Sequence, residues 1–295
     1  MALRIITGII GIIISAIVIQ LGGAPFAGFA ILLALIGWYE YYSAFTRANI
    51  DTSFFLGAFA LILMLCCAWL GNIEELLAVL TLGSLAIFLL TVLFSMRPHE
   101  AFVSVGGLCY LGLPFAHLIM LRFFADEPHQ VRSLVDFHNF VSENLGNINF
   151  FETLSNLNFD GGCELVWILF ACTWASDTFA YFIGTAIGSH RLAPSISPNK
   201  SVEGFLGSIV GTTLTAVVVG TFLFGYPLMQ MATIGAILAI VATLGDLVES
   251  SIKRFTGVKD SGILIPGHGG VLDRFDSILY TAPVFYYFIL VSKII

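Results

Sequence analysis

One stretch of the chain, residues 251–276, gathers most of the side chains that could perform polar chemistry in an otherwise apolar sequence. Three glycines surround His268, and glycine lets backbone N–H groups approach a ligand closely or converge on an anion. Asp273 and Asp276 stand one helical turn apart, so their carboxylates could hold a hard cation such as Mg²⁺. The candidates for this phosphate and metal site are Lys253, Arg254, Lys259, Asp260, Gly267, His268, Gly269, Gly270, Asp273, Arg274 and Asp276.

Asp177 falls in the middle of an apolar run, where an ionisable side chain is costly and is a functional candidate by default. Polar and small residues accompany it at helical spacings and form a stripe that a ligand or a second helix could approach. They are Thr173, Ser176, Tyr181 and Gly184. The alternative is a structural carboxylate that hydrogen-bonds to a neighbouring helix. We favour a binding role.

Residues 197–204 read Ser-Pro-Asn-Lys-Ser-Val-Glu-Gly and are expected to end a loop and begin a helix. Asn199 or Ser201 could cap this helix, and Glu203 in its first turn would suit the helix dipole. Capping leaves Lys200 unexplained at a helix N-terminus, which is a place suited to anions. An incoming phosphate would account for Lys200.

Residues 245–254 run from an apolar span into the polar stretch. Asp246, Glu249, Ser250 and Lys253 are related by steps of three or four residues, which places them on one helix face. A pair between Glu249 and Lys253 could be surface electrostatics alone. Asp246 lies deeper in the span, so we expect it to belong to the site.

The composition places the chain in a membrane. Of its 295 residues 58% are hydrophobic and only 11% are charged, which is too few charges to cover a soluble globule. The first apolar run could be a signal peptide, but we favour a retained helix because more spans follow at once. We expect an all-α polytopic bundle of about nine transmembrane helices, near residues 5–21, 26–42, 53–70, 76–94, 102–124, 165–188, 205–224, 231–248 and 278–294.

Other features of the sequence argue against several functions and structural devices. The net charge of −7 points to no partner, because the acids lie at scattered sites of different kinds. The five cysteines lack metal-ligand spacing and are expected to be free thiols in the core. Nothing resembles a nucleic-acid-binding module, and no internal repeat of the kind found in many transporters is visible.

The distribution of basic residues predicts the orientation, because cytoplasmic loops carry an excess of Lys and Arg. An N-terminus in the cytoplasm puts nine basic residues on that side, namely Arg4, Arg47, Arg97, Arg191, Lys200, Lys253, Arg254, Lys259 and Arg274. The other side carries three, namely Arg122, Arg132 and Lys293. The polar stretch then faces the cytoplasm, where nucleotides are found.

Three regions are expected along the chain. Residues 1–124 form five transmembrane helices, and residues 125–163 form an extracytoplasmic loop with one amphipathic helix expected around 131–141. Residues 164–295 form the catalytic transmembrane region, which includes a cytoplasmic loop at 249–276.

Several of these motifs together resemble the signature of the phosphatidate cytidylyltransferases, also called CDP-diacylglycerol synthases. The likeness is contiguous over residues 251–276, which include Lys-Asp at 259–260, Pro-Gly-His-Gly-Gly at 266–270 and Asp-Arg-Phe-Asp at 273–276. It extends to Asp-Thr-x-Ala-Tyr-x-x-Gly at 177–184, Ser-Pro-Asn-Lys-Ser-x-Glu-Gly at 197–204 and Gly-Asp-Leu-x-Glu-Ser at 245–250. The first 160 residues match only as generic apolar helices.

This resemblance implies transfer of CMP from CTP to phosphatidic acid, which forms CDP-diacylglycerol and pyrophosphate. It implies Mg²⁺ held mainly by Asp246 and Asp273, with Asp276 and Asp177 as helpers, and leaves open a second cation such as K⁺. The implied catalytic residues are Asp246, Asp273, Lys200, His268 and Arg274. The implied substrate-binding residues are Asp177, Ser201, Glu203, Lys253, Arg254, Lys259, Asp260, Gly267, Gly269 and Gly270.

The expected setting is the inner (plasma) membrane, with the site facing the cytoplasm and a homodimer left open. Two other classes remain as alternatives. A secondary transporter or channel would use intramembrane carboxylates to bind protons or cations. A lipid kinase or a phosphosugar transferase would release CDP or UMP rather than pyrophosphate.

Overall fold

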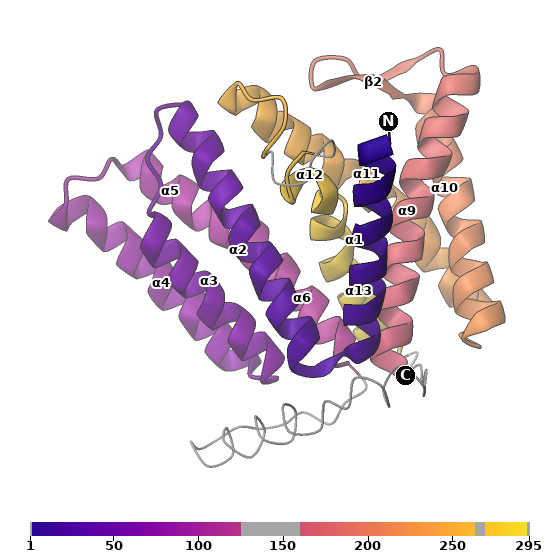
Figure 1. Ribbon diagram of the computed structural model, residues 1–295, viewed down its shortest axis with the longest axis horizontal. Helices are drawn as coiled ribbons and strands as arrows, with labels where there is room; N and C mark the ends of the chain where they lie inside the picture. Colours follow the sequence, from indigo (N-terminus) through magenta and orange to yellow (C-terminus); the bar gives the residue numbers. More distant parts are fainter. Residues whose placement is uncertain (1, 125–159, 263–268, 294–295) are drawn as a thin grey trace.

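The computed structural model describes residues 2–124, 160–262 and 269–293, and in these ranges the chain is a bundle of helices with one short β-hairpin (Figure 1). Seven helices of the described ranges are long and apolar enough to cross a membrane. Two shorter apolar helices, Ile10–Leu21 and Phe54–Trp69, accompany them. The chain is therefore an all-α polytopic membrane protein.

The helices of the first half are α1 (Ala2–Leu21), α2 (Gly23–Arg47), α3 (Phe54–Trp69), α4 (Ile73–Leu93), α5 (Pro98–Gly107) and α6 (Leu113–Arg122), with the π-helical turn η1 (Leu108–Gly112) between the last two. The second half contains α9 (Gly161–Ile187), β1 (Arg191–Ala193), β2 (Ser197–Ser201), α10 (Val202–Ala216), the π-helical segment η2 (Val217–Leu223), α11 (Leu228–Thr256), α12 (Leu272–Phe275) and α13 (Ile278–Ser292). Each predicted apolar segment is helical; the segment at 102–124 covers α5, η1 and α6, and the one at 205–224 covers α10 and η2. The predicted amphipathic helix at 131–141 lies outside the described residues.

The outer surface of the bundle is apolar, as a lipid environment requires. Helix α4 buries only Leu76 and Ile87 and leaves side chains such as Leu85 and Val92 exposed by 60% and 78%. A soluble protein would not present such a face to water. In a bilayer these side chains contact acyl chains, while the backbone polar groups are satisfied within the helix.

Small residues bring α9 and α10 close together. A Cβ atom at Gly204 would meet the carbonyl oxygen of Ala180, and one at Gly207 would meet the side chain of Ile183. Small residues at such spacings let membrane helices pack backbone against backbone. Ala180 and Ile183 therefore lie on the face of α9 against which α10 packs, together with Gly184 of the predicted stripe.

Two segments differ from the expectation for them. Residues 191–201, expected as a plain loop, form an antiparallel hairpin in which Arg191 pairs with Ser201 and Ala193 with Ser197. Helix α11 continues to Thr256, past the apolar span predicted to end at 248, and so includes the helix face predicted from Asp246 to Lys253. Figure 1 shows the hairpin, α12, the start of α1 and the end of α2 at one end of the bundle, here called the hairpin end.

A buried cation ties three helices together at the opposite end. The guanidinium of Arg122, which is 4% exposed, donates from Nε to the carbonyl oxygen of Ile19 at 2.9 Å and from Nη1 to Asp160 at 2.7 Å. Asp160 also accepts the backbone N–H of Cys163 and so caps α9. This contact fixes α1, α6 and α9 relative to one another.

Candidate active site

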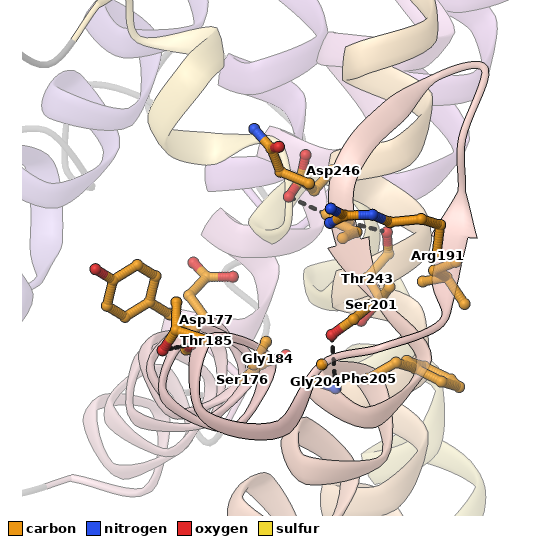
Figure 2. A pocket seen from close by; sticks show the side chains of 16 residues that line it. Ser176, Asp177, Gly184, Thr185, Arg191, Ser201, Gly204, Phe205, Thr243 and Asp246 are labelled. Carbon is orange, nitrogen blue, oxygen red and sulfur yellow. Dashed lines mark hydrogen bonds and ion pairs between the residues drawn. The ribbon is translucent and has the colours of Figure 1, made fainter.

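A cavity of about 680 Å³ opens at the hairpin end between α9, the β-hairpin, α10 and α11 (Figure 2). We call it the α9–α11 cavity. Its charged lining residues are Asp177, Arg191, Lys200 and Asp246. Ser176, Tyr181 and Gly184 of the predicted stripe also line it, whereas the Thr173 hydroxyl is buried and donates to Leu169. The volume is in the usual range of small-molecule sites.

The central contact of the α9–α11 cavity joins Lys200 to Asp246, with 2.6 Å between Nζ and Oδ2. The other carboxylate oxygen of Asp246 accepts the Ser250 hydroxyl at 3.2 Å. Asp177 interacts electrostatically with Asp246, Lys200 and Arg274. The motifs at 177–184, 197–204 and 245–250 are therefore brought to one site.

Local packing explains how these side chains meet. Ser201 caps α10 by accepting the N–H of Gly204 at 3.1 Å, which places Lys200 directly before the helix. Gly245 lets α11 approach the backbone of Asp276 and Ser277, because a Cβ there would meet the Asp276 carbonyl oxygen at 2.6 Å. Asp276 accordingly lies within electrostatic range of Asp246 and Asp177.

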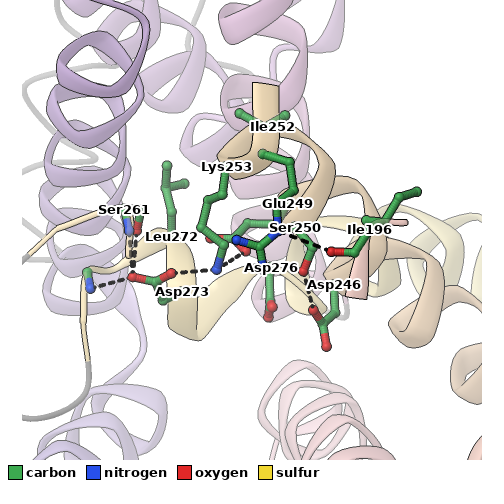
Figure 3. A network of polar contacts seen from close by, with 12 residues as sticks. Ile196, Asp246, Glu249, Ser250, Ile252, Lys253, Ser261, Leu272, Asp273 and Asp276 are labelled. Atoms are coloured by element: carbon green, nitrogen blue, oxygen red, sulfur yellow. Dashed lines mark hydrogen bonds and ion pairs between the residues drawn. The ribbon is translucent and has the colours of Figure 1, made fainter. Parts of the chain in front are cut away.

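A second network, next to the first on α11, is centred on Lys253 (Figure 3). Its ammonium group lies 2.5 Å from Glu249 Oε2 and 2.8 Å from Asp273 Oδ1. Both carboxylates are nearly buried, with side chains exposed by 3% and 7%. The predicted face of α11 is thus confirmed, and the pair of Glu249 and Lys253 is no mere surface contact.

The remaining oxygen of Asp273 is held by three donors. They are the backbone N–H of Ser261 at 2.9 Å, the Ser261 hydroxyl at 2.8 Å and the N–H of Gly270 at 2.8 Å. Gly269 has φ +86°, and a Cβ atom there would press on Asp273 Oδ2 at 2.5 Å. Only glycine suits this position, because its backbone is left-handed and close to a carboxylate.

Glu40 of α2 is part of the site, and the sequence analysis did not name it. Its carboxylate, 3% exposed, accepts the backbone N–H groups of Val271 at 3.0 Å and Leu272 at 2.9 Å. The Ser261 hydroxyl lies 3.5 Å from Glu40 Oε2. An isolated carboxylate in an apolar span was the available signal, because the criterion applied to Asp177 applies equally to Glu40.

The other predicted residues occupy different surroundings. Lys259 and Asp260 line a separate cavity beside α2, and Arg254 donates to the carbonyl oxygen of Ile196 at 3.3 Å. Glu203 accepts the His190 backbone N–H and lies 2.6 Å from His190 Nδ1, so it holds the start of the hairpin. His268 and Gly267 lie outside the described residues.

The acidic residues suit a hard cation that takes further ligands from its surroundings. No three His, Cys, Asp or Glu side chains within the described ranges form a group that could hold a metal by themselves. Asp246 and Asp273 each bind a lysine ammonium instead, which shows that positive charge is stable at both carboxylates. One or two carboxylates completed by water and substrate phosphates are an ordinary environment for Mg²⁺.

The fold and these charged networks define a polytopic membrane protein with a polar site at one end of its helix bundle. The chain belongs to the cytidylyltransferase family, whose model matches residues 2–292, and is therefore a nucleotidyltransferase. The family match extends over the first half, which the sequence analysis treated as generic helices. Nucleotidyltransferases in general use a divalent cation, for which the acidic side chains above are the candidates.

Several bacterial relatives carry the name phosphatidate cytidylyltransferase. The one from Synechocystis sp. is 33% identical over 292 residues, 97% of this chain and 95% of the relative. The one from Staphylococcus haemolyticus is 29% identical over 289 residues, 96% of this chain and 97% of the relative. The one from Bacillus subtilis is 43% identical over 142 residues, 47% of this chain and 52% of the relative.

Proposed function

We propose that the protein transfers CMP from CTP to phosphatidic acid, forming CDP-diacylglycerol and pyrophosphate. The observation that carries the proposal is the meeting of Asp177, Lys200 and Asp246 from three separate segments in one cavity of an integral membrane protein. The names of the relatives that match nearly the full chain support the same reaction.

In this reaction an oxygen of the lipid phosphate forms a bond to the α-phosphorus of CTP. The bond from that phosphorus to the oxygen that bridges it to the β-phosphorus breaks, and pyrophosphate leaves. Such displacement depends mainly on positioning and on the neutralisation of charge. The lipid phosphate is already ionised at neutral pH, so no strong general base is needed and we assign His268 a donor role.

The lysines and carboxylates of the site would act together on the triphosphate. Mg²⁺ bound by Asp246 and Asp273, with Asp276 and Asp177 as helpers, would supply charge neutralisation to the phosphates. Lys200 and Lys253, now paired with the two principal ligands, would turn to phosphate oxygens once those carboxylates are engaged. Arg254 and Arg274 are further candidates for phosphate contacts.

We further propose nine spans, an N-terminus in the cytoplasm, and a site that faces the cytoplasm from the inner membrane. The apolar helices α1 and α3, which are not among the seven candidate spans, would complete the count. A second cation such as K⁺ and a homodimer also belong to this proposal. We also propose that residues 1–124, 125–163 and 164–295 form three functional regions.

Nucleotide selection tests the proposed reaction. The purified protein in detergent, given phosphatidic acid, Mg²⁺ and each nucleoside triphosphate in turn, should release pyrophosphate and form a CDP-lipid with CTP. Release of CDP, or turnover with ATP in preference to CTP, would instead indicate a lipid kinase and contradict the proposal.

A further inference from the structure

A second cavity, also of about 680 Å³, lies at the hairpin end between α2 and residues 259–262. We call it the α2 cavity. Neither Lys200 nor Asp246 lines it, so within the described residues it is separate from the α9–α11 cavity. It nevertheless adjoins the Lys253 network, because its lining residues Glu40 and Ser261 hold the segment that carries Asp273.

One stripe of α2 forms the long wall of the α2 cavity. Leu35, Tyr39, Ser43 and Arg47 follow one another at steps of four residues, with Ile36 beside the first. The stripe changes from apolar to polar to cationic toward the end of the helix. From Leu35 to Arg47 it rises by about 18 Å, close to the thickness of one leaflet of a hydrocarbon core of about 30 Å.

The polar end of the α2 cavity carries two cations that form no ion pair within the described part of the chain. Arg47 and Lys259 are both exposed, and neither forms an ion pair with any other residue of the described ranges. Of the two acidic lining residues, Glu40 is already engaged by backbone N–H groups. The charges left to act on a ligand are therefore two cations and the carboxylate of Asp260.

We propose that the α2 cavity binds an anionic phospholipid, with its phosphate at Arg47 and Lys259 and its acyl chains along Leu35, Ile36 and Tyr39. Basic side chains near a membrane surface attract anionic headgroups, and the apolar part of the stripe matches a chain in a single leaflet. A soluble nucleotide would leave this apolar wall unused. This inference rests on the proposed function and extends it. The anionic phospholipid is then either the substrate phosphatidate or a second anionic lipid.

This placement would present the lipid phosphate to the Lys253 network from the side opposite the α9–α11 cavity. Ser261 lines the α2 cavity and donates to Asp273, whose other oxygen contacts Lys253. The two substrates would then approach Lys253 from different cavities. Lys259, predicted from the sequence as a phosphate and substrate contact, is assigned to the lipid.

The experiment uses the full-length protein in nanodiscs of phosphatidylcholine with graded mole fractions of phosphatidate. Arg47→Gln, Lys259→Gln and the double variant are compared with Arg97→Gln, an exposed arginine that does not line the α2 cavity. We expect the KM for phosphatidate to rise about fivefold in each single variant and about 25-fold in the double variant, from about 1 kcal/mol per basic residue. The kcat and the KM for CTP should stay unchanged.

Further arms separate the sources of the phosphate. If the double variant instead keeps its KM for phosphatidate but loses stimulation by added phosphatidylglycerol, a second anionic lipid occupies the site, and the proposal still holds. A rise confined to the KM for CTP would assign the cavity to a soluble phosphate and overturn it. Variants indistinguishable from Arg97→Gln in all three measurements would overturn it as well.

A binding measurement keeps this inference distinct from the proposed reaction. Phosphatidate retained by the purified protein is quantified by native mass spectrometry without CTP, so no turnover is needed. Loss of retention in the double variant supports the α2 cavity even if the wild-type protein forms no CDP-lipid, a result that would defeat the proposed function alone. Equal retention by wild-type protein and double variant counts against the site.

Discussion

At the scale of single residues, the candidate site is a set of carboxylates that differ in what holds them. Asp246 and Asp273 each contact a lysine, whereas Glu40 contacts the backbone N–H groups of Val271 and Leu272. A carboxylate that accepts hydrogen bonds from backbone N–H groups holds a segment of the chain in place, whereas one paired with a lysine contacts a flexible side chain. Glu40 is accordingly a positioning residue for Asp273.

Replacement of Glu40 tests this role. Glu40→Ala leaves two backbone N–H groups without their acceptor, at a cost of roughly 1–3 kcal/mol for each buried group. We expect a fall in kcat of tenfold or more and a higher Mg²⁺ concentration for half-maximal activity, because the segment at 271–272 that positions Asp273 loses its anchor. Glu40→Gln, which keeps one acceptor oxygen, should lie between alanine and wild type.

A merely structural role for Glu40 would give a different pattern. The unfolding temperature in detergent would then fall in both variants. The Mg²⁺ dependence of the activity, measured on the protein that remains folded, would match that of the wild type. Asp51→Asn serves as the control, since Asp51 is an exposed carboxylate in the loop after α2.

At the scale of elements, the α9–α11 cavity depends on how closely α9 and α10 approach each other. Gly207 has no room for a Cβ because Ile183 of α9 already occupies that space. Gly28 of α2 provides a matched comparison, since a Cβ there would meet nothing within 4 Å. Alanine substitutions at these two glycines therefore distinguish the effect of close helix packing from the effect of helix propensity.

We predict opposite effects of alanine at these two glycines. Gly207→Ala should destabilise the bundle by about 1–3 kcal/mol, as overpacking does, and reduce activity by displacing the wall that carries Asp177. Gly28→Ala should leave activity intact and stabilise α2 by up to about 1 kcal/mol. Thermal unfolding with activity assays on the same preparations measures both, and equal stability of the two variants would refute the packing argument.

At the scale of the whole molecule, the two charged networks lie at the hairpin end, and contacts of Arg122 with Ile19 and Asp160 hold helices together at the opposite end. The orientation predicted from the basic residues would place the hairpin end in the cytoplasm. A nucleotide from the cytoplasm could reach the site without crossing the membrane if the hairpin end faces inward.

Thiol labelling tests this orientation. In a background with the five native cysteines replaced, Arg97→Cys should react with a membrane-impermeant reagent in inside-out vesicles and Lys293→Cys in right-side-out vesicles. Arg97 directly precedes α5, which begins toward the hairpin end, and Lys293 follows α13 near the C-terminus at the opposite end (Figure 1). The reverse labelling pattern would contradict an N-terminus in the cytoplasm.

Much of the fold was predictable because a membrane imposes a simple rule on sequence. Apolar runs of spanning length must be helical to satisfy their backbone, so each predicted segment coincides with a helix. The apolar span predicted for α11 stops at 248, but the three- and four-residue spacing of its polar face predicted that the helix continues to Lys253, as the structure confirms. The β-hairpin was missed because its short strands carry no apolar alternation.

The candidate site was only partly predictable, for a related reason. Motif spacing located Asp177, Lys200 and Asp246, and the structure brings them to one cavity. It could not reveal Glu40, whose role depends on a contact with residues more than 200 positions away in the sequence. Nor could spacing show that Lys259 lines a different cavity from Lys200, since both belong to basic motifs in the same half of the chain.

The most direct measurement for the central claim is Mg²⁺-dependent transfer of label from CTP to phosphatidic acid by purified Asp246→Asn and Asp273→Asn proteins. The proposed function has both carboxylates bind one cation that neutralises the triphosphate, so it predicts a loss of at least about 100-fold in each variant. Asp51→Asn should keep full activity. Wild-type rates with ordinary Mg²⁺ dependence in either Asp246→Asn or Asp273→Asn would contradict the account.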